Sequence, residues 1–174
     1  MIESHVRGAM AMSRWLQRHI PIVGPAAALL VDRMLLIAYG LDVTSKSVNI
    51  GCLSISHPGG ILLGGNGIVS PGRVAVMAGV KFVGRSPNDP RYVAAAREGV
   101  TFRLGDNVVI GANSVVVGPV EICDDVVIGA MSLVNSSITE PGVYVGCPAR
   151  RIAEALTDEW VAHLPAPKRA QRDR

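Results

Sequence analysis

From Leu104 to Ile138 the chain repeats itself every six residues, and this period constrains its fold more than any other feature. One apolar position of the repeat holds Leu104, Ile110, Val116, Ile122, Ile128 and Val134. A small or β-branched residue follows each of them four places later, at Val108, Ser114, Val120, Val126, Ser132 and Ile138. A helix repeats about every 3.6 residues and a strand about every 2, so neither explains a period of six as one continuous element. The period predicts a solenoid whose coils have three short straight edges, each edge sending apolar side chains inward.

The composition agrees with a thin, regularly coiled interior. Of the 174 residues 49% are hydrophobic but only 4% are aromatic, so the core is expected to consist of Val, Ile, Leu and Ala. The length suits about one domain. The three cysteines have neither paired nor metal-ligand spacing, and their number is odd: Cys52, Cys123 and Cys147. We therefore expect reduced thiols in a cytoplasmic protein.

Charge and hydropathy limit the partners. The formal net charge is +3, and much of the excess stands at the end of the chain, at Lys168, Arg169, Arg172 and Arg174. We expect a solvated tail and no nucleic-acid partner, because no aromatic platform or recognition motif accompanies these charges. Residues 1–13 contain no signal-peptide core. The apolar stretch Ile20–Tyr39 is interrupted by Pro21, Pro25, Asp32 and Arg33, so we expect no stable membrane insertion, although its amphipathic character leaves a peripheral contact open.

Helical patterns are confined to the two ends of the chain. The sequence predicts a helix over 6–18 that ends before Pro21, and a second from Pro25 to Tyr39 with Gly40 as its C-terminal cap. An extra residue is expected in the solenoid around Gly64–Gly67, where glycine tolerates a bulge. Between Gly84 and Arg103 the period fails, which predicts a protruding loop over about 85–103. A capping helix is expected over Arg151–Leu164, because the last coil needs a cover.

Several motifs outside the repeat give the chain a resemblance to a known family. They are Gly40-Leu41-Asp42-Val43, Ile55-Ser56-His57-Pro58-Gly59-Gly60-Ile61, Gly79-Val80-Lys81-Phe82-Val83-Gly84 and Gly146-Cys147-Pro148-Ala149-Arg150. With these and the hexads, residues 20–152 resemble the left-handed parallel β-helix acyltransferases, and within them the serine acetyltransferase branch. The resemblance implies a mainly β fold: an N-terminal helical segment (1–40), a left-handed parallel β-helix acyltransferase domain (41–149), and a C-terminal capping helix with a basic tail (150–174). It also implies a homotrimer with active sites between subunits and acetyl-CoA as the acyl donor.

His57 is the candidate catalytic base, since it is the only histidine within the predicted solenoid. Imidazole accepts a proton from a hydroxyl near neutral pH. Asp42 stands fifteen residues earlier, just short of one coil, so it can approach His57 from the neighbouring rung and orient the imidazole. The resemblance assigns the family's catalytic Asp-His pair to these two residues. The alternative is a surface histidine and a helix-end aspartate. A single solenoid histidine cannot supply the three zinc ligands of a γ-type carbonic anhydrase, so we expect no metal.

The resemblance also points to residues that bind acetyl-CoA. Those that let the pantetheine arm approach the backbone are expected to be Gly84, Arg85, Gly111, Ala112, Ala130 and Ser132. Arg150 and Arg151 are expected to meet the coenzyme A phosphates, which a modestly basic protein suits. The alternative for the glycines is turn geometry alone, and for the arginines a solvated helix start.

Two departures from the serine acetyltransferase pattern concern the acceptor. Ser56 stands where the family has an aspartate before the catalytic histidine, and Glu98-Gly99-Val100-Thr101 stands near the family's Arg-His pair. Arg91 or Arg97 is a candidate replacement for the lost acceptor contact. We therefore expect direct acyl transfer to the hydroxyl of another small molecule or of a sugar. A genuine serine O-acetyltransferase of cysteine biosynthesis, transfer to an amine, and a non-catalytic scaffold remain the alternatives.

Overall fold

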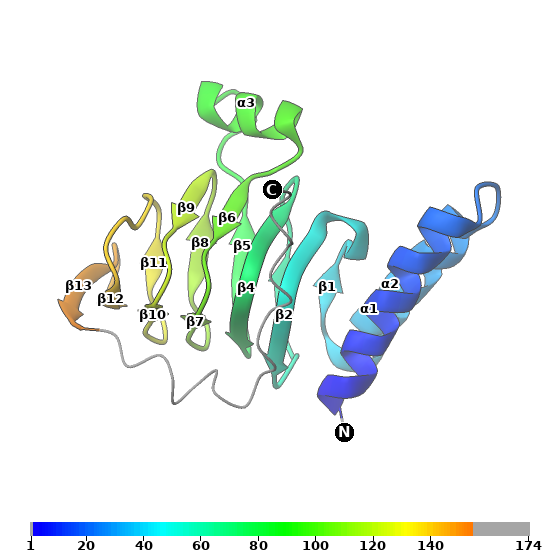
Figure 1. Cartoon of the computed structure of the whole chain (residues 1–174), viewed down its shortest axis with the longest axis horizontal. Coiled ribbons are helices and arrows are strands. Elements are labelled where there is room, and N and C mark those ends of the chain that lie inside the picture. Colours follow the sequence, from blue (N-terminus) through cyan, green and yellow to red (C-terminus); the bar gives the residue numbers. More distant parts are fainter. Residues whose placement is uncertain (1, 155–174) are drawn as a thin grey trace, which may run out of the picture.

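The computed structural model describes residues 2–154, which form a helical hairpin followed by a β-solenoid (Figure 1). The helices of the hairpin are α1 (Ile2–His19) and α2 (Gly24–Tyr39). The solenoid contains β1 (Asp42–Val43), the short 3₁₀ helix η1 (Ser45–Ser47), β2 (Val48–Ser56), β3 (Leu62–Leu63), β4 (Ile68–Met77), β5 (Lys81–Val83), β6 (Phe102–Leu104), β7 (Val108–Ile110), β8 (Val115–Val117), β9 (Val120–Ile122), β10 (Val126–Ile128), β11 (Leu133–Val134), β12 (Gly142–Val145) and β13 (Arg150–Ala153). A third helix, α3 (Pro90–Glu98), is inserted between β5 and β6.

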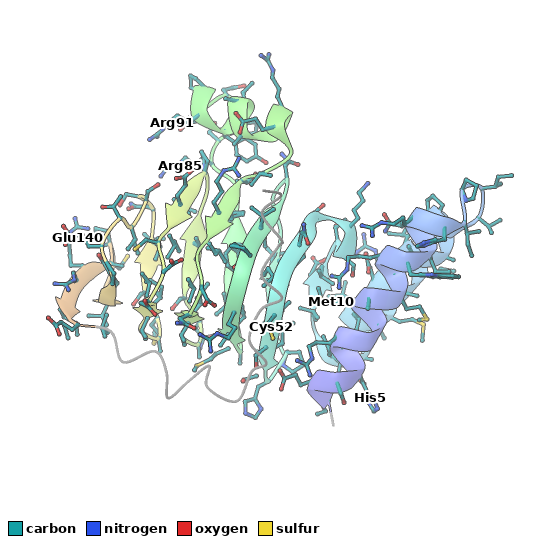
Figure 2. The ribbon with its side chains drawn as sticks, viewed as in Figure 1. His5, Met10, Cys52, Arg85, Arg91 and Glu140 are labelled. Atoms are coloured by element: carbon teal, nitrogen blue, oxygen red, sulfur yellow. The ribbon has the colours of Figure 1, made fainter. Side chains whose placement is uncertain are left out.

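The hairpin covers one end of the solenoid, and both of its predicted helices are confirmed. α1 begins earlier than expected, at Ile2, and Met10 on its inner side packs into the main core (Figure 2). α2 ends as predicted at Gly40, which is left-handed (φ 66°) and donates its N–H to the carbonyls of Leu35 and Leu36. The helices approach closely at Gly24, where a Cβ would lie 2.2 Å from the carbonyl oxygen of Leu16. Any larger residue at position 24 would therefore force the hairpin apart.

Each solenoid coil contributes a strand to three faces. One face is the sheet β1-β3-β5-β8-β11, and the other two are halves of a larger sheet that the long strands β2 and β4 bridge. β4 pairs through Ile68 and Val69 with β6 on one face and through Val74–Val76 with β7 on the next. The pairing between coils is parallel throughout. The predicted parallel β-helix is therefore present over the described residues.

The hexad positions fill the interior of the solenoid, as the period predicts. All twelve residues of the two periodic sets, from Leu104 to Ile138, are buried. In the regular part Val108 pairs with Val126, eighteen residues later. The expected extra residue around Gly64–Gly67 is also present. Six residues lead from Leu62 to Ile68, whereas five lead from Val115 to Val120 at the matching corner.

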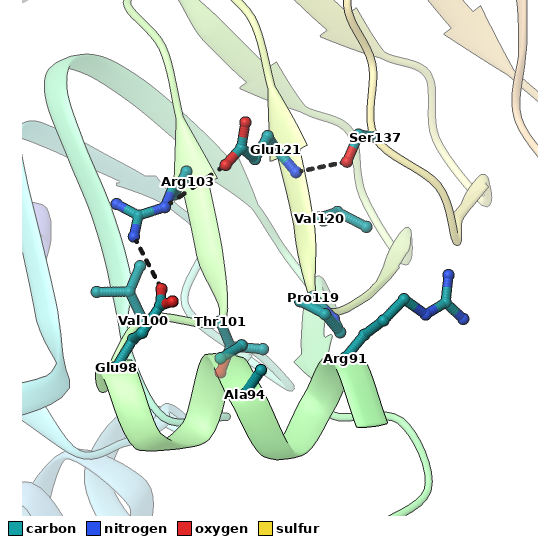
Figure 3. A pocket seen from close by; sticks show the side chains of 11 residues that line it. Arg91, Ala94, Glu98, Val100, Thr101, Arg103, Pro119, Val120, Glu121 and Ser137 are labelled. Carbon is teal, nitrogen blue, oxygen red and sulfur yellow. Dashed lines mark hydrogen bonds and ion pairs between the residues drawn. The ribbon is translucent and has the colours of Figure 1, made fainter. Parts of the chain in front are cut away.

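The predicted loop over 85–103 is wrong in one respect, because it contains a helix. Asp89 caps α3 by accepting the Arg91 N–H at 2.9 Å, Pro90 occupies the first turn, and left-handed Gly99 ends the helix. The insertion returns to the solenoid at Gly67, whose carbonyl accepts the N–H groups of Thr101 and Phe102. The helix lies beside the ends of the strands at which β6 and β9 begin (Figure 3).

The predicted C-terminal helix is corrected over the residues that the structure describes. Arg151–Ala153, its expected first residues, belong instead to β13, which pairs antiparallel with β12. By pairing with β12, β13 supplies hydrogen-bond partners for the backbone N–H and C=O groups of the last coil, which the predicted helix was expected to cover. The remainder of the expected helix, up to Leu164, lies outside the described residues.

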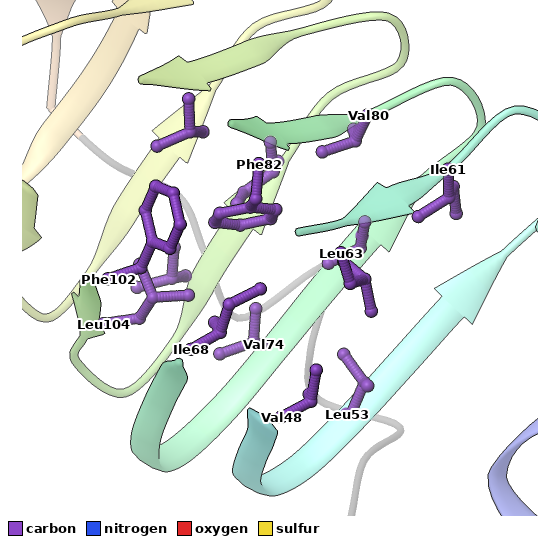
Figure 4. Packing of buried hydrophobic residues seen from close by; sticks show 14 of the residues in the cluster. Val48, Leu53, Ile61, Leu63, Ile68, Val74, Val80, Phe82, Phe102 and Leu104 are labelled. Carbon is purple, nitrogen blue, oxygen red and sulfur yellow. The ribbon is translucent and has the colours of Figure 1, made fainter. Parts of the chain in front are cut away.

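The only two phenylalanines in the sequence meet in the middle of the core. Phe82 of β5 and Phe102 of β6 are almost fully buried, and their rings pack edge to face with centroids 5.0 Å apart (Figure 4). This pair stands where the α3 insertion leaves and re-enters the solenoid. It therefore holds the two ends of the insertion together.

We expect Phe82→Ala to lower the free energy of unfolding by about 3–5 kcal/mol, because it removes a buried ring and leaves a cavity. Urea denaturation would measure the loss. Ile37→Ala is the matched control, since Ile37 on α2 is 85% exposed and its truncation should change stability by less than about 0.5 kcal/mol. Equal effects of the two substitutions would contradict this account of the core.

Candidate active site

His57 lies on the corner between β2 and β3, which is longer than the corresponding corner of the next coil, between β4 and β5. Ser56 pairs with Met77, and the Gly79 N–H donates to the Gly59 carbonyl. Three residues therefore separate Ser56 from Gly60, whereas one separates Met77 from Gly79. His57 and Pro58 are thus a two-residue insertion into the repeat. Pro58 is buried and His57 is exposed, so the insertion pushes the imidazole outward from the corner.

The backbone of His57 has an unusual conformation. Its φ is +58°, in the left-handed region that costs a residue with a side chain about 1–2 kcal/mol. Gly60 on the same corner and Gly79 on the next corner are left-handed without this cost, whereas Asn113 and Met131 on the following corners are left-handed and carry side chains. Strain of this kind persists where the surrounding structure imposes it, and it is concentrated at functional sites.

Asp42 opens the strand that stands beside the end of this corner. Its N–H donates to the Ile61 carbonyl at 2.9 Å, and Asp42 pairs with Leu62 in the ladder. The side chains of Asp42 and His57 are both exposed. Among residues 2–154 neither side chain makes a hydrogen bond or an ion pair. Asp42 therefore stands beside Leu62, five residues beyond His57, and the contact by which Asp42 would orient His57 stays a prediction.

Four of the predicted donor-binding residues follow the same edge of the solenoid as His57. Gly111 and Ala112 occupy the corner after β7, and the Met131 N–H donates to the Ala112 carbonyl, which stacks Ala130 on Ala112. Ala130 is exposed and Ala112 is half-buried. Arg150 extends the row, because it pairs with Val145 of the last coil. A ligand lying along this edge would meet small side chains first and a guanidinium at the end.

Ser132, another predicted donor-binding residue, and Gly111 serve the architecture of that edge. Ser132 is buried, its hydroxyl accepts the Gly146 N–H at 3.1 Å, and its own N–H donates to Ser114 Oγ at 3.2 Å. A Cβ at Gly111 would lie 2.6 Å from the Ala130 nitrogen. Both positions keep successive corners in contact. Arg151 is exposed, and its Nε donates to the Pro141 carbonyl at 2.8 Å.

The remaining predicted residues lie on the next edge and on α3. Gly84 and Arg85 follow β5. The Arg85 guanidinium donates to the backbone carbonyl of Asn135, while its Nε is buried without a partner among the described residues (Figure 2).

The two candidate arginines of α3 are exposed. Arg91 pairs with Asp89 at 3.2 Å, and hydrogen bonds from Arg91 hold the pKa of the Asp89 carboxyl below its usual value. Arg97 is exposed near the end of α3. Within a single chain these arginines therefore lie away from the edge that carries His57.

A hollow of about 330 Å³ beneath α3 was not foreseen from the sequence. Arg103 lies within it and pairs with Glu98 and Glu121, each at 3.5 Å (Figure 3). Arg91 and Ser137 also line it. The hollow depends on α3, and the sequence does carry signals for that helix: Asp89-Pro90 at its start and Gly99 at its end.

Two of the three cysteine thiols are poorly suited to act as nucleophiles. Burial raises the pKa of the Cys52 and Cys123 thiols, which disfavours the reactive thiolate form. No group of three or more His, Cys, Asp and Glu side chains within residues 2–154 is placed to hold a metal ion.

Comparisons with known proteins agree with this architecture. Residues 103–136 match the family model described as bacterial transferase hexapeptide (six repeats). A crystal structure of serine acetyltransferase from Neisseria gonorrhoeae is 24% identical, with a TM-score of 0.72 over 88% of this chain and 56% of its own. Soybean serine acetyltransferase complexed with serine is 21% identical (TM-score 0.64; 83% and 54%). A serine acetyltransferase complex with CoA is 22% identical (TM-score 0.62; 85% and 56%). Among curated proteins no match was found.

The chain thus contains the hexapeptide repeat of bacterial transferases. It has, over most of its length, the fold of the serine acetyltransferases. It spans a little more than half of the length of those structures.

We expect His57→Gly to raise the free energy of unfolding by about 1 kcal/mol, because glycine adopts a positive φ without steric strain. Urea denaturation would measure the gain. Asn113→Gly is the control: Asn113 has a φ of +59° on a matching corner, but asparagine tolerates this region, so its gain should be smaller. A loss of stability in His57→Gly would show that the imidazole supports the fold.

Proposed function

We propose that this protein is an acetyl-CoA-dependent O-acetyltransferase in which His57 is the general base. The observation that carries the proposal is the position of His57. It is the one solenoid histidine, and a two-residue insertion presents it to solvent at an edge of a serine acetyltransferase fold.

The proposed reaction needs one proton carrier. The imidazole takes the proton of the acceptor hydroxyl while the hydroxyl oxygen attacks the thioester carbonyl of acetyl-CoA. The tetrahedral intermediate then collapses, the bond from carbon to sulfur breaks, and the imidazolium returns the proton to the coenzyme A thiolate. Asp42 would orient the ring and stabilise its protonated form. Because the thioester is already activated, no covalent acyl-enzyme is required.

The donor would lie across the outer face of the sheet β1-β3-β5-β8-β11. This face stands between the edge that carries His57, Ala112 and Ala130 and the edge that carries Gly84 and Arg85. Its outward side chains include half-buried Leu62, Val83, Val115, Val117 and Leu133. Its strands are two or three residues long, so both edges are within reach of one extended ligand. The CoA complex of a structurally similar protein supports coenzyme A as the donor.

A homotrimer with active sites between subunits would complete this site. Within one chain Arg91 and Arg97 lie on α3, away from His57, so a neighbouring subunit is needed to bring such a residue to the acceptor. The donor would then lie between the apolar outer face of this sheet and the neighbouring subunit, and cyclic symmetry would close the set. We place this activity in the cytoplasm, in keeping with thiols that form no predicted disulfides.

Ser56 directs the choice of acceptor. It is exposed beside His57, where serine acetyltransferases resemble one another in carrying an aspartate, so a cationic amino group loses its partner. We therefore propose the hydroxyl of a sugar or of a small molecule other than free serine. A genuine serine acetyltransferase is the second candidate, favoured by the serine complex of the soybean structure.

Replacing His57 by alanine should lower turnover by about 10²–10⁴-fold, the range for the loss of a general base. Asp42→Asn should lower it less, because the base itself remains. Thiol release from acetyl-CoA would measure both variants. His5→Ala is the control, since His5 is exposed on α1 and should leave turnover unchanged. Full activity in His57→Ala with intact assembly would rule out His57 as the base, whereas absence of thiol release in the unmodified protein would favour a scaffold.

The acceptor can be identified by thiol release across L-serine, D-serine, homoserine, amino sugars and neutral sugars. We expect release with a sugar or another hydroxyl compound and little with L-serine. Ser56→Asp should then shift activity toward L-serine, because it restores an anion for the amino group. Release with L-serine alone in the unmodified protein would favour the cysteine-biosynthesis alternative.

A further inference from the structure

The helical hairpin exposes large apolar side chains that the fold does not use. The turn between α1 and α2 carries Ile22 and Val23, which are 91% and 63% exposed, and Trp15 on α1 is half exposed near the same tip. α2 continues this surface with Leu30, Met34 and Ile37, all more than 60% exposed. We call these six residues the hairpin patch. Monomeric proteins rarely leave so many neighbouring apolar side chains in water without a use for them.

The exposed charges on the hairpin between Ser4 and Leu41 are of one sign. Arg18 and Arg33 are exposed on the two helices, as is Arg7, which pairs with Glu3 at 4.0 Å. Between Ser4 and Leu41 the only carboxylate in the sequence is that of Asp32. This side chain is 6% exposed and accepts hydrogen bonds from the Ser45 N–H and hydroxyl at 3.0 and 2.6 Å. Over this range the hairpin therefore presents apolar and cationic groups to solvent, with no exposed anion among them.

The hairpin patch is held in a fixed shape. The turn is closed by hydrogen bonds from Ile20 to Leu16 and from Gly24 to Ile20, each 3.0 Å long, and Gly24 lets the helices touch. The opposite sides of both helices are engaged, since Val6, Met10 and Leu35 belong to the solenoid core. The hairpin lies at the end of the solenoid opposite β13, where the tip projects past the coils (Figure 1). A flat surface can therefore reach the tip without meeting α3 or the solenoid edges.

We propose that the hairpin patch binds the surface of an anionic membrane. Ile22, Val23 and Trp15 would enter the boundary between headgroups and acyl chains, while Arg18 and Arg33 would extend to the lipid phosphates. The binding is peripheral, because no helix in residues 2–154 is long and apolar enough to cross a bilayer. Charge separates this partner from a second copy of the chain, because pairing two hairpin patches would place arginines against arginines. The proposal is independent of acyl transfer.

Co-sedimentation of the full chain with vesicles tests the proposal. We expect binding to vesicles of phosphatidylcholine with phosphatidylserine, weak binding to phosphatidylcholine alone, and loss of binding at high salt. The double variant Ile22→Ser with Val23→Ser should lower the partition coefficient at least tenfold, and Arg18→Gln and Arg33→Gln about fivefold each.

Two variants serve as matched controls. Ile152→Ser removes an apolar side chain that is 63% exposed on β13, and Arg97→Gln removes an exposed charge on α3. Neither should change vesicle binding. Equal binding to neutral and anionic vesicles, or equal binding by the hairpin variants and the unmodified chain, would overturn the proposal. A fall in oligomeric mass caused by Ile22→Ser with Val23→Ser in the absence of vesicles would also overturn it, because it would assign the patch to contacts between copies.

Discussion

The backbone hydrogen bonds between successive coils are the interaction on which the rest of this structure depends. Because the pairing is parallel and in register, each residue of a coil stands directly over its equivalent in the next. Side chains therefore form columns, apolar inside the solenoid and varied outside it. The core needs few aromatic rings, since each column packs Val, Ile or Leu against its own kind. The same registration aligns Ala112 with Ala130 along one edge, so a straight ligand could follow the columns of this scaffold.

A regular solenoid offers flat walls and no cleft, so chemistry must arise where the repeat is interrupted. Two of the interruptions within residues 2–154 carry candidate site residues: the insertion of His57 and Pro58 at one corner, and the longer insertion that carries α3. The first exposes an imidazole on a strained backbone. The second raises arginines and a lined hollow above the neighbouring face, and the pair formed by Phe82 and Phe102 anchors its ends. Both insertions leave the interior columns intact, which is why the fold tolerates them.

The six-residue period predicted the interior of the solenoid, because burial of one side chain per edge follows from coil geometry alone. The helices of the hairpin were predictable from their caps. α3 was not recognised, because Pro87 to Pro90 indicated a loop although Asp89 and Gly99 carry cap signals. β13 was mistaken for a helix, since a short exposed strand has no apolar period of its own. For His57 and Asp42 the spacing indicated proximity, but side-chain orientation depends on corner geometry, which the spacing does not encode.

The antiparallel direction of β13 has a consequence for how the solenoid can grow. Every other coil offers its successor a parallel edge, so further coils could be added indefinitely by repeating the same rule. β13 reverses the chain and presents an edge that carries Arg150 and Arg151, and an antiparallel edge no longer matches the next rung. Fibre-like stacking of one solenoid on another is thereby discouraged at this end. Whole coils could therefore be added or removed in the middle of the solenoid without disturbing either end.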